Sequence, residues 1–250
     1  RTILTCETFR QTSRVSASQY QSDPNNRWYG RGPRYRLSAE AIRDTALQAA
    51  GLLDSRLQGP SVSPYQPPGL WKEVSFNPTD YSAQVFRQSH GADLYRRGMY
   101  TFWKRSAPPP NMVAFGAPTR EICVVQRSRE ETPIQALVLM NDPTFVEAAR
   151  VLATELLDER GQDRTRLRQL WMIAMSREPS NVETEITLKT LNKLRVYYSA
   201  KNAAADELLA VGEYPLVETK SVLVLARSEL AAWTCLCSVI LQQDEVLTQH

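Results

Sequence analysis

Apolar residues recur at helical spacing through most of the second half of the chain. The stripes consist of Phe145, Ala149, Leu152 and Leu156; of Leu167, Leu170, Trp171 and Ala174; of Leu191, Leu194 and Tyr198; and of Leu230, Trp233, Cys237, Ile240 and Leu241. Spacings of three and four residues place each set on one face of an α-helix. From Thr132 onward the pattern predicts four or five helices joined by short loops, as in a helical bundle. Strands and helices do not alternate, which argues against a Rossmann-type sheet.

Short polar motifs mark where these helices begin. In residues 132–135 (Thr-Pro-Ile-Gln), the threonine can cap a helix, the proline suits its first turn, and the glutamine completes a capping box. Asp142 is expected to end that helix and to cap the next one. Ser180 with Glu183 predicts a second capping box and a helix that runs to about residue 204. Residues 205–220 are weakly patterned.

The first half is less regular. Ser38 is expected to cap a helix that closes near Asp54, and four prolines exclude a helix from residues 59–69. Asp93 predicts a further helix through Trp103, although the aromatic residues of that stretch also suit a strand. Residues 111–131 are the best candidate for short strands or extended packing.

These patterns predict a mainly α protein with two unlike halves. Residues 1–131 are expected to be irregular and loop-rich, with one or two helices and short strands. Residues 132–250 are expected to form the helical bundle. We expect the two halves to fold as one cooperative unit, cut from a larger protein, because Ile3 and Leu4 resemble part of a packed element.

Composition excludes some classes of protein. Hydrophobic residues make up 42% of the 250 residues and charged residues 23%, which is ordinary for a globular protein and argues against disorder. The most apolar run, residues 230–241, is too short to span a bilayer. Only two histidines are present and the four cysteines do not cluster, so no metal site is predicted. Cys6, Cys123, Cys235 and Cys237 are expected to be buried free thiols.

The net charge of +3 is unevenly distributed. Residues 1–36 carry a net charge of +5, residues 93–129 again +5, and residues 130–250 a net charge of −6. This asymmetry can steer an anionic partner, or the two halves can pack together and pair their charges. The basic residues are balanced by acidic ones and no nucleic-acid motif is present, so no nucleic-acid partner is predicted.

Several stretches in order resemble one known family. They are residues 10–14 (RQTSR), 36–44 (RLSAEAIRD), 59–62 (GPSV), 93–97 (DLYRR), 100–105 (YTFWKR), 120–123 (REIC), 132–137 (TPIQAL), 141–143 (NDP) and 244–245 (DE). The chain is similar to the planctomycete-type PSD1 domain of unknown function. That domain forms the C-terminal region of large exported proteins, which often carry a planctomycete cytochrome c domain.

The resemblance implies an extracytoplasmic protein, periplasmic or at the cell surface, whose haem c lies in an upstream domain. The chain itself has no CxxCH motif for attaching haem covalently. Members of the family are similar to proteins encoded beside sulfatases and carbohydrate-degrading enzymes. The sequence departs from the family pattern at Gly116, where Asp is usual, and at Glu130 and Glu131, where Thr-Asn is usual.

The candidate ligand-binding residues are mostly basic. Arg96, Arg97, Lys104 and Arg105 interleave with aromatic residues that include Trp103. Such a stretch can form a basic, aromatic groove in which rings stack on sugars and cations bind sulfate or carboxylate. The alternative is an amphipathic element with aromatic residues in the core and charges at the surface.

Three further positions extend this list. Arg120 lies near Cys123, whose thiolate an arginine can activate, although a lone cysteine among apolar residues is more often part of the core. Arg43 is expected on the polar side of the first helix, within reach of Glu40, while the adjacent Asp44 does not face it. The two carboxylates can act as an acid–base pair only if the fold brings a third group close. Asn141 lies at a helix break, where free backbone groups can build a binding site.

Three functions remain open. The leading hypothesis is an accessory or interaction domain of an exported, cytochrome-c-linked protein, which packs on upstream domains of the same polypeptide and binds an anionic polysaccharide or a redox protein. The second is part of the active site of a carbohydrate-directed oxidoreductase or hydrolase that upstream domains complete. The third is a structural cell-surface assembly protein.

Overall fold

The computed structural model describes residues 2–74, 85–127, 130–159, 161–216 and 227–249. Its helices are α1 (Thr2–Thr5), α2 (Ala17–Ser22), α3 (Ala39–Ala49), α4 (Leu70–Glu73), α5 (Pro110–Ala114), α6 (Pro133–Asn141), α7 (Pro143–Asp158), α8 (Asp163–Met175), α9 (Asn181–Ala200), α10 (Asn202–Leu209), α11 (Arg227–Leu241) and α12 (Asp244–Leu247). Two 3₁₀ turns, η1 (Gly91–Tyr95) and η2 (Gly98–Tyr100), and two strands, β1 (Tyr35–Arg36) and β2 (Thr248–Gln249), complete the described elements. The prediction of a mainly α fold is confirmed.

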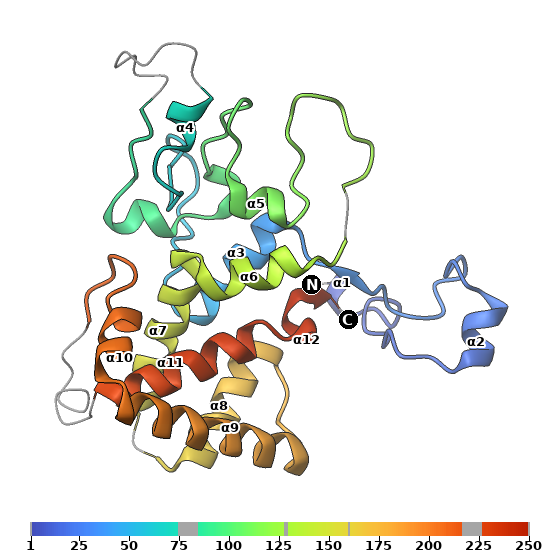
Figure 1. The fold of residues 1–250 in the computed structure, drawn as a ribbon. Helices are drawn as coiled ribbons and strands as arrows, with labels where there is room; N and C mark the ends of the chain where they lie inside the picture. Colours follow the sequence, from blue (N-terminus) through green and yellow to red (C-terminus); the bar gives the residue numbers. More distant parts are fainter. Residues whose placement is uncertain (1, 75–84, 128–129, 160, 217–226, 250) are drawn as a thin grey trace.

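Helices α7 and α11 form the centre of the bundle (Figure 1). Their facing surfaces carry small residues, and Ala149, Ala153 and Ala231 are fully buried. Small side chains let two helices approach closely, so that Leu152 and Trp233 fill the space around the contact. Helices α8, α9 and α10 then cover the remaining apolar faces.

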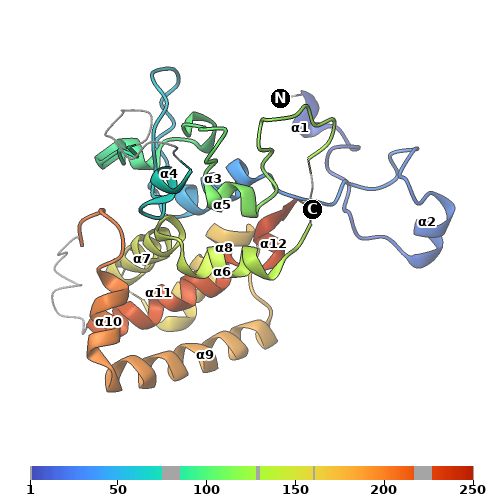
Figure 2. The ribbon, with the colours of Figure 1, turned by 45° about the horizontal axis from the view of Figure 1, so that its top comes forward.

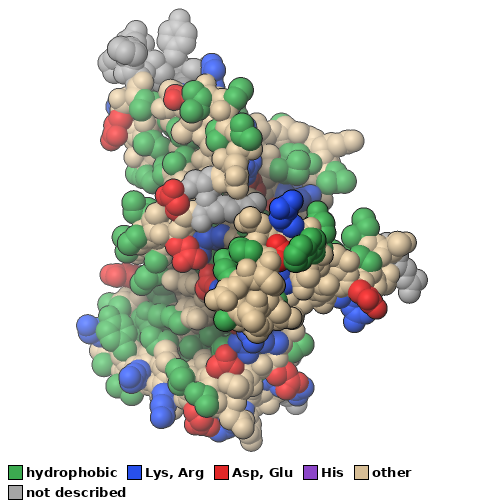
Figure 3. Space-filling view, turned by 90° about the vertical axis from the view of Figure 1, so that its right-hand side faces the viewer, with side chains coloured by type: hydrophobic (Ala, Val, Ile, Leu, Met, Phe, Trp, Pro, Cys, Tyr) green, Lys and Arg blue, Asp and Glu red, His purple; other side chains and the backbone are tan. Residues whose placement is uncertain are grey.

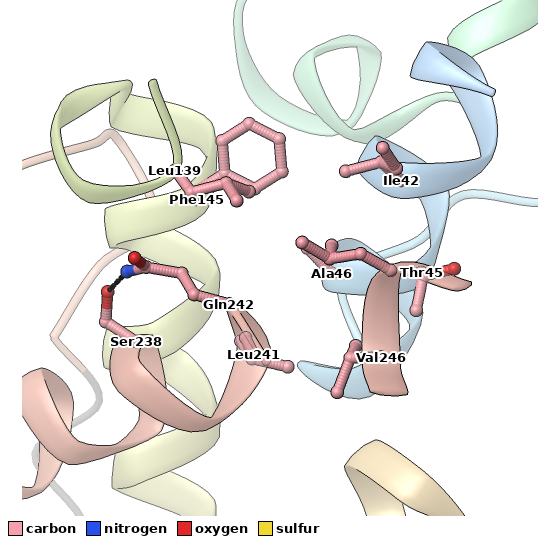
Figure 4. A pocket seen from close by; sticks show the side chains of 10 residues that line it. Ile42, Thr45, Ala46, Leu139, Phe145, Ser238, Leu241, Gln242 and Val246 are labelled. Carbon is pink, nitrogen blue, oxygen red and sulfur yellow. Dashed lines mark hydrogen bonds between the residues drawn. The ribbon is translucent and has the colours of Figure 1, made fainter. Parts of the chain in front are cut away.

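The first half of the chain reaches this core through α3 and a short sheet. Strand β1 pairs antiparallel with β2, which joins Arg36 to Thr248. Ile42 and Ala46 of α3 face Phe145 and other apolar side chains of α6, α7, α11 and α12 (Figure 4). The space left between them is only about 10 Å³, room for about one water molecule. This contact is therefore part of the core and not a ligand site.

The N-terminal segment, residues 2–34, projects from the rest of the molecule as an arm (Figures 1 and 2). No residue of α1 or α2 is buried. Ile3 and Leu4 are exposed, so the expectation that they belong to a packed element is wrong for the chain as described. Trp28 is 78% exposed. Seen from the side of the arm, hydrophobic side chains lie at the surface beside scattered basic ones (Figure 3).

Most predicted helix starts are confirmed. Ser38 accepts a hydrogen bond from the amide of Ala41, and Asp142 accepts one from the amide of Thr144. Ser180 and Glu183 form the expected capping box at the start of α9. At the start of α6 the helix begins as predicted, but the expected capping box is absent: Thr132 makes no capping hydrogen bond.

Other predictions in the first half are wrong. The helix predicted from Asp93 to Trp103 is two short 3₁₀ turns followed by extended chain, in which the amide of Phe102 bonds to the carbonyl of Val62 at 2.7 Å. The strands predicted for residues 111–131 are absent from the described part of that stretch, which contains α5 instead.

Two boundaries also differ from the prediction. Helix α3 ends at Ala49 instead of near Asp54, because Gly51 takes the left-handed conformation, with φ of +64°. The weakly patterned stretch after residue 204 lies partly in α10, whose helix ends at Leu209. Within the described residues no helix has both the length and the apolar character needed to cross a membrane.

Candidate functional site

Arg43 and Arg96, two of the predicted ligand-binding residues, are buried and bound to the protein's own backbone. Arg43 donates to the carbonyls of Arg96 and Leu94 at 2.6 and 2.5 Å. Arg96 donates to carbonyls of the loop that follows α3, including that of Pro60 at 3.0 Å, and its guanidinium stacks on the ring of Tyr100. The expectation that these two arginines face a ligand is corrected: they hold the irregular half together.

The neighbourhood of Arg43 also differs from the sequence-based picture. Arg43 is 2% exposed and does not lie on a polar face. It lies 3.8 Å from Asp44, the neighbour that was not expected to face it. Glu40 pairs with Arg127 instead, at 2.7 Å. The long arginine side chain turns toward η1, so helical spacing alone did not identify its partner.

A cleft of about 640 Å³ lies along the outer side of α3, and we call it the α3 cleft. It is lined by Ser38, Glu40, Ala41, Asp44, Thr45, Gln48, Ala49, Leu53, Arg97, Met99 and Ile173. Asp44 accepts a 2.6 Å hydrogen bond from the amide of Gly98 and lies 3.6 Å from Nε of Arg97. The fold therefore brings a third group, Arg97, to the two carboxylates of α3.

The two carboxylates of the α3 cleft differ in acidity. Burial raises the pKa of Asp44 above its ordinary value, even though the Gly98 amide and the arginines Arg43 and Arg97 act against it. Burial also acts to raise the pKa of Glu40, but hydrogen bonds from its own amide and from Arg127 outweigh burial and lower that pKa. Two neighbouring carboxylates with opposite shifts can hold different protonation states at one pH.

A second candidate is an aromatic–basic surface, which we define as Phe102, Trp103, Lys104, Arg105 and Arg120, with Trp71 buried beneath Lys104. The ammonium of Lys104 lies 4.4 Å from the centre of the Trp71 ring, and the guanidinium of Arg120 lies 4.6 Å from that of Trp103. Trp103 donates its indole N–H to the carbonyl of Thr119. Because residues 102–104 are extended, Trp103 points to a different side from its two neighbours. The Lys104–Trp71 pair and the Arg120–Trp103 pair therefore lie on different sides of this segment, and exposed Arg105 follows it.

The predicted site residues do not meet in one pocket. Arg97 lies at the α3 cleft, whereas Trp103, Lys104, Arg105 and Arg120 belong to the aromatic–basic surface. Asn141 is exposed at the end of α6, where its amide donates to the carbonyl of Leu137. Arg43 and Arg96 are buried, and their hydrogen bonds go to backbone carbonyls of the first half.

Sequence reasoning missed a buried polar network around Glu147 on α7. This carboxylate is fully buried, and it accepts hydrogen bonds from Tyr65 at 3.1 Å, from Tyr95 at 3.2 Å and from the amide of Tyr214 at 2.6 Å. Arg150, also buried, lies 3.6 Å from it. Burial and the nearby carboxylate raise the pKa of both tyrosines. The available signal was a charged Glu–Arg pair at i, i+3 inside an apolar helix.

The cysteines are less buried than expected. Cys6 and Cys123 are exposed, Cys235 is half-buried, and Cys237 is buried. The burial prediction is therefore wrong for the first two, and burial raises the pKa of the Cys237 thiol. Across the described ranges no three His, Cys, Asp or Glu side chains are grouped to hold a metal ion. His90, the one described histidine, pairs with Glu213 at 2.8 Å.

Comparison with known proteins places the chain in a family. No curated protein and no solved structure matches it. One family model does match, over residues 1–191, which extends from the arm to the middle of α9 and covers both candidate sites. The chain therefore belongs to the PSD1 family, described as a protein of unknown function (DUF1553).

Proposed function

We propose that this chain is an accessory interaction domain that binds an anionic polysaccharide through the aromatic–basic surface. The observation that carries the proposal is the guanidinium of Arg120 held over the ring of Trp103, with exposed Arg105 two residues further along the chain from Trp103. Ring faces suit sugar rings, and the cations suit the sulfate or carboxylate groups attached to them.

The charge distribution supports an anionic ligand. Residues 93–129 hold seven basic and two acidic residues, and three of the basic ones, Lys104, Arg105 and Arg120, belong to this surface. The guanidinium of Arg120 is held over an indole ring, so it loses less freedom when it binds an anion. An exposed site of this kind is expected to bind more weakly as ionic strength rises.

The test is the affinity for a sulfated polysaccharide such as dextran sulfate, measured by isothermal titration calorimetry at low and at physiological salt. Trp103→Ala and Arg120→Ala are each expected to reduce the affinity about tenfold. Trp28→Ala and Arg168→Ala serve as controls, because Trp28 lies on the arm and Arg168 is an exposed arginine of α8 paired with Glu178. Both controls are expected to bind like the wild type.

Three results would count against the proposal. Absence of binding at low salt would refute the proposal. Equal losses of affinity in the control variants would show nonspecific charge attraction. Binding that neutral dextran matches at the same concentrations would show that the anionic groups are not recognised. Tight binding of a redox protein, abolished by Arg105→Ala with no polysaccharide binding, would instead support the redox-partner alternative.

We also propose that the arm contacts another domain of the same polypeptide, in an exported, cytochrome-c-linked protein. Support comes from Phe9, Trp28 and Tyr29, large apolar side chains that are more than half exposed, and from the net charge of +5 on residues 1–36. Exposed apolar side chains gathered on one projection are typical of an interaction surface. Hydrogen exchange of the arm, compared between this chain and the longer protein, is expected to slow in the longer protein; unchanged exchange would refute the contact.

A further inference from the structure

The α3 cleft is unlike the aromatic–basic surface in shape and in charge. Its volume of about 640 Å³ falls within the range of roughly 300–1,000 Å³ that is usual for small-molecule sites. One wall is a polar row, Glu40, Asp44 and Gln48, spaced one helical turn apart on α3. Arg97 lines the cleft from the segment between η1 and η2.

The two carboxylates of the polar row are held by contacts with other parts of the chain. The amide of Gly98 holds Asp44, and Arg127 holds Glu40. Gly98 allows this close contact, because a Cβ atom there would lie only 3.0 Å from Cα of Glu40. Polar groups held in place before a ligand arrives give a site its selectivity.

The lining of the α3 cleft indicates the class of ligand. The carboxylates of Glu40 and Asp44 accept hydrogen bonds, while Arg97 donates them. Leu53, Met99 and Ile173 add an apolar part to the same lining. A ring with one apolar face and a rim of hydroxyl groups matches both parts. Glu40 is paired with Arg127 and Asp44 with Arg97, so the lining offers no cation without a carboxylate beside it to an anionic ring.

We propose that the α3 cleft binds a hydroxylated ring without an anionic group, the chemistry of a neutral sugar unit. Glu40 and Asp44 accept hydrogen bonds from ring hydroxyls, Arg97 donates to a hydroxyl oxygen, and the apolar side chains lie against a face of the ring. This site is separate from the aromatic–basic surface and binds a neutral ligand instead of an anionic one. The inference therefore does not rest on the proposed function.

The test is saturation-transfer NMR on the intact chain with glucose, galactose, mannose and xylose, each compared with glucuronate. At least one neutral sugar is expected to bind at a concentration of about 10 mM or lower, and glucuronate at least about tenfold more weakly. Asp44→Asn removes the charge and Gln48→Ala removes an exposed side chain from the rim. Both are expected to weaken neutral-sugar binding, whereas Glu185→Gln on α9, whose carboxylate also pairs with an arginine, is expected to leave it unchanged.

The outcomes separate the two sites. Trp103→Ala is expected to leave neutral-sugar binding intact, because Trp103 does not line the α3 cleft. Absence of binding by all four neutral sugars at about 10 mM, equal binding of glucuronate, or an unchanged affinity in Gln48→Ala would each overturn the inference. If Asp44→Asn fails to fold, Gln48→Ala still tests the inference, because the Gln48 side chain lies at the surface and is not part of the core.

Discussion

Replacement of Glu147 by leucine is expected to destabilise the whole chain strongly. Leucine is apolar and cannot accept a hydrogen bond, so the hydroxyls of Tyr65 and Tyr95 and the amide of Tyr214 lose their acceptor. Arg150 loses its carboxylate partner while staying buried. The substitution therefore leaves several donors without this acceptor, and a buried cation that keeps its hydrogen bond to the carbonyl of Tyr214 but has lost its carboxylate.

The size of the effect follows from these contacts. A buried donor left without an acceptor costs about 1–3 kcal/mol, and breaking a buried ion pair by removing one partner costs about 3–5 kcal/mol. The contributions are not additive because the groups belong to one network. We expect Glu147→Leu to lower the free energy of unfolding by about 3–5 kcal/mol, a large part of the total of about 5–15 kcal/mol usual for a native protein.

Urea unfolding followed by far-UV circular dichroism measures the loss. Glu185→Gln is the control, since its exposed ion pair with Arg164 is expected to contribute at most about 1 kcal/mol. The double variant Glu147→Leu/Arg150→Met is expected to lose less than the sum of the two single variants, because it removes both charges of the pair. A loss of less than about 1 kcal/mol in Glu147→Leu would refute the reasoning.

Three further predictions concern stability. Gly212→Ala is expected to lower the free energy of unfolding by more than about 1 kcal/mol, measured by urea unfolding, because Gly212 has φ of +90° and a Cβ atom would lie 2.2 Å from Oε1 of Glu147; wild-type stability would contradict this. Ser180→Ala is expected to cost about 1 kcal/mol in the same assay through loss of the cap on α9, and no loss would contradict the cap's role. Hydrogen bonding to Arg177 lowers the pKa of Glu183 to about 2 from its ordinary 4.5, so this pair stabilises the fold above pH 4.5 and the contribution disappears as pH falls toward 2. Arg177→Met is expected to flatten the pH dependence of stability in that range. An unchanged acid unfolding curve would show that the pair of Arg177 and Glu183 does not contribute to stability.

The sequence predicted the helices of the second half because their signals are local. A cap such as Ser180 and a stripe such as Phe145 to Leu156 depend on residues within a few turns of one another. The same kind of signal identified α3 from Ser38. In these segments tertiary packing agrees with the local preference, so periodicity was sufficient.

The stretch from Asp93 to Trp103 could not be predicted in the same way. Its periodicity suits a helix, but Arg43 takes the carbonyls of Leu94 and Arg96, more than 50 residues away in the chain. A continuous helix needs its interior carbonyls for its own hydrogen bonds. Hydrogen bonds with Arg43 therefore take the place of helical hydrogen bonds in this stretch. No residue pattern within the stretch predicts them.

The candidate sites show the same limit. Arg96 and Arg97 are adjacent and chemically identical, yet Arg96 is 4% exposed and binds backbone carbonyls, while Arg97 lines the α3 cleft. Sequence reasoning identified both as candidates from residue type. A structural arginine can be distinguished from one that can bind a ligand only by the groups that each side chain contacts in the fold.

In the irregular half, buried charged side chains satisfy backbone groups that a sheet would satisfy in other folds. A loop-rich segment has few backbone hydrogen bonds of its own, and its carbonyls need donors when they are buried. Arg43 and Arg96 supply these donors to two segments, and Glu147 accepts hydrogen bonds from Tyr95 and Tyr65 of the same two segments. The α3 cleft and the aromatic–basic surface both lie on segments that these anchors hold. Their geometry therefore depends on side chains that touch no ligand, and Arg96→Met is expected to impair the aromatic–basic surface through its support, although the residues of that surface are unchanged.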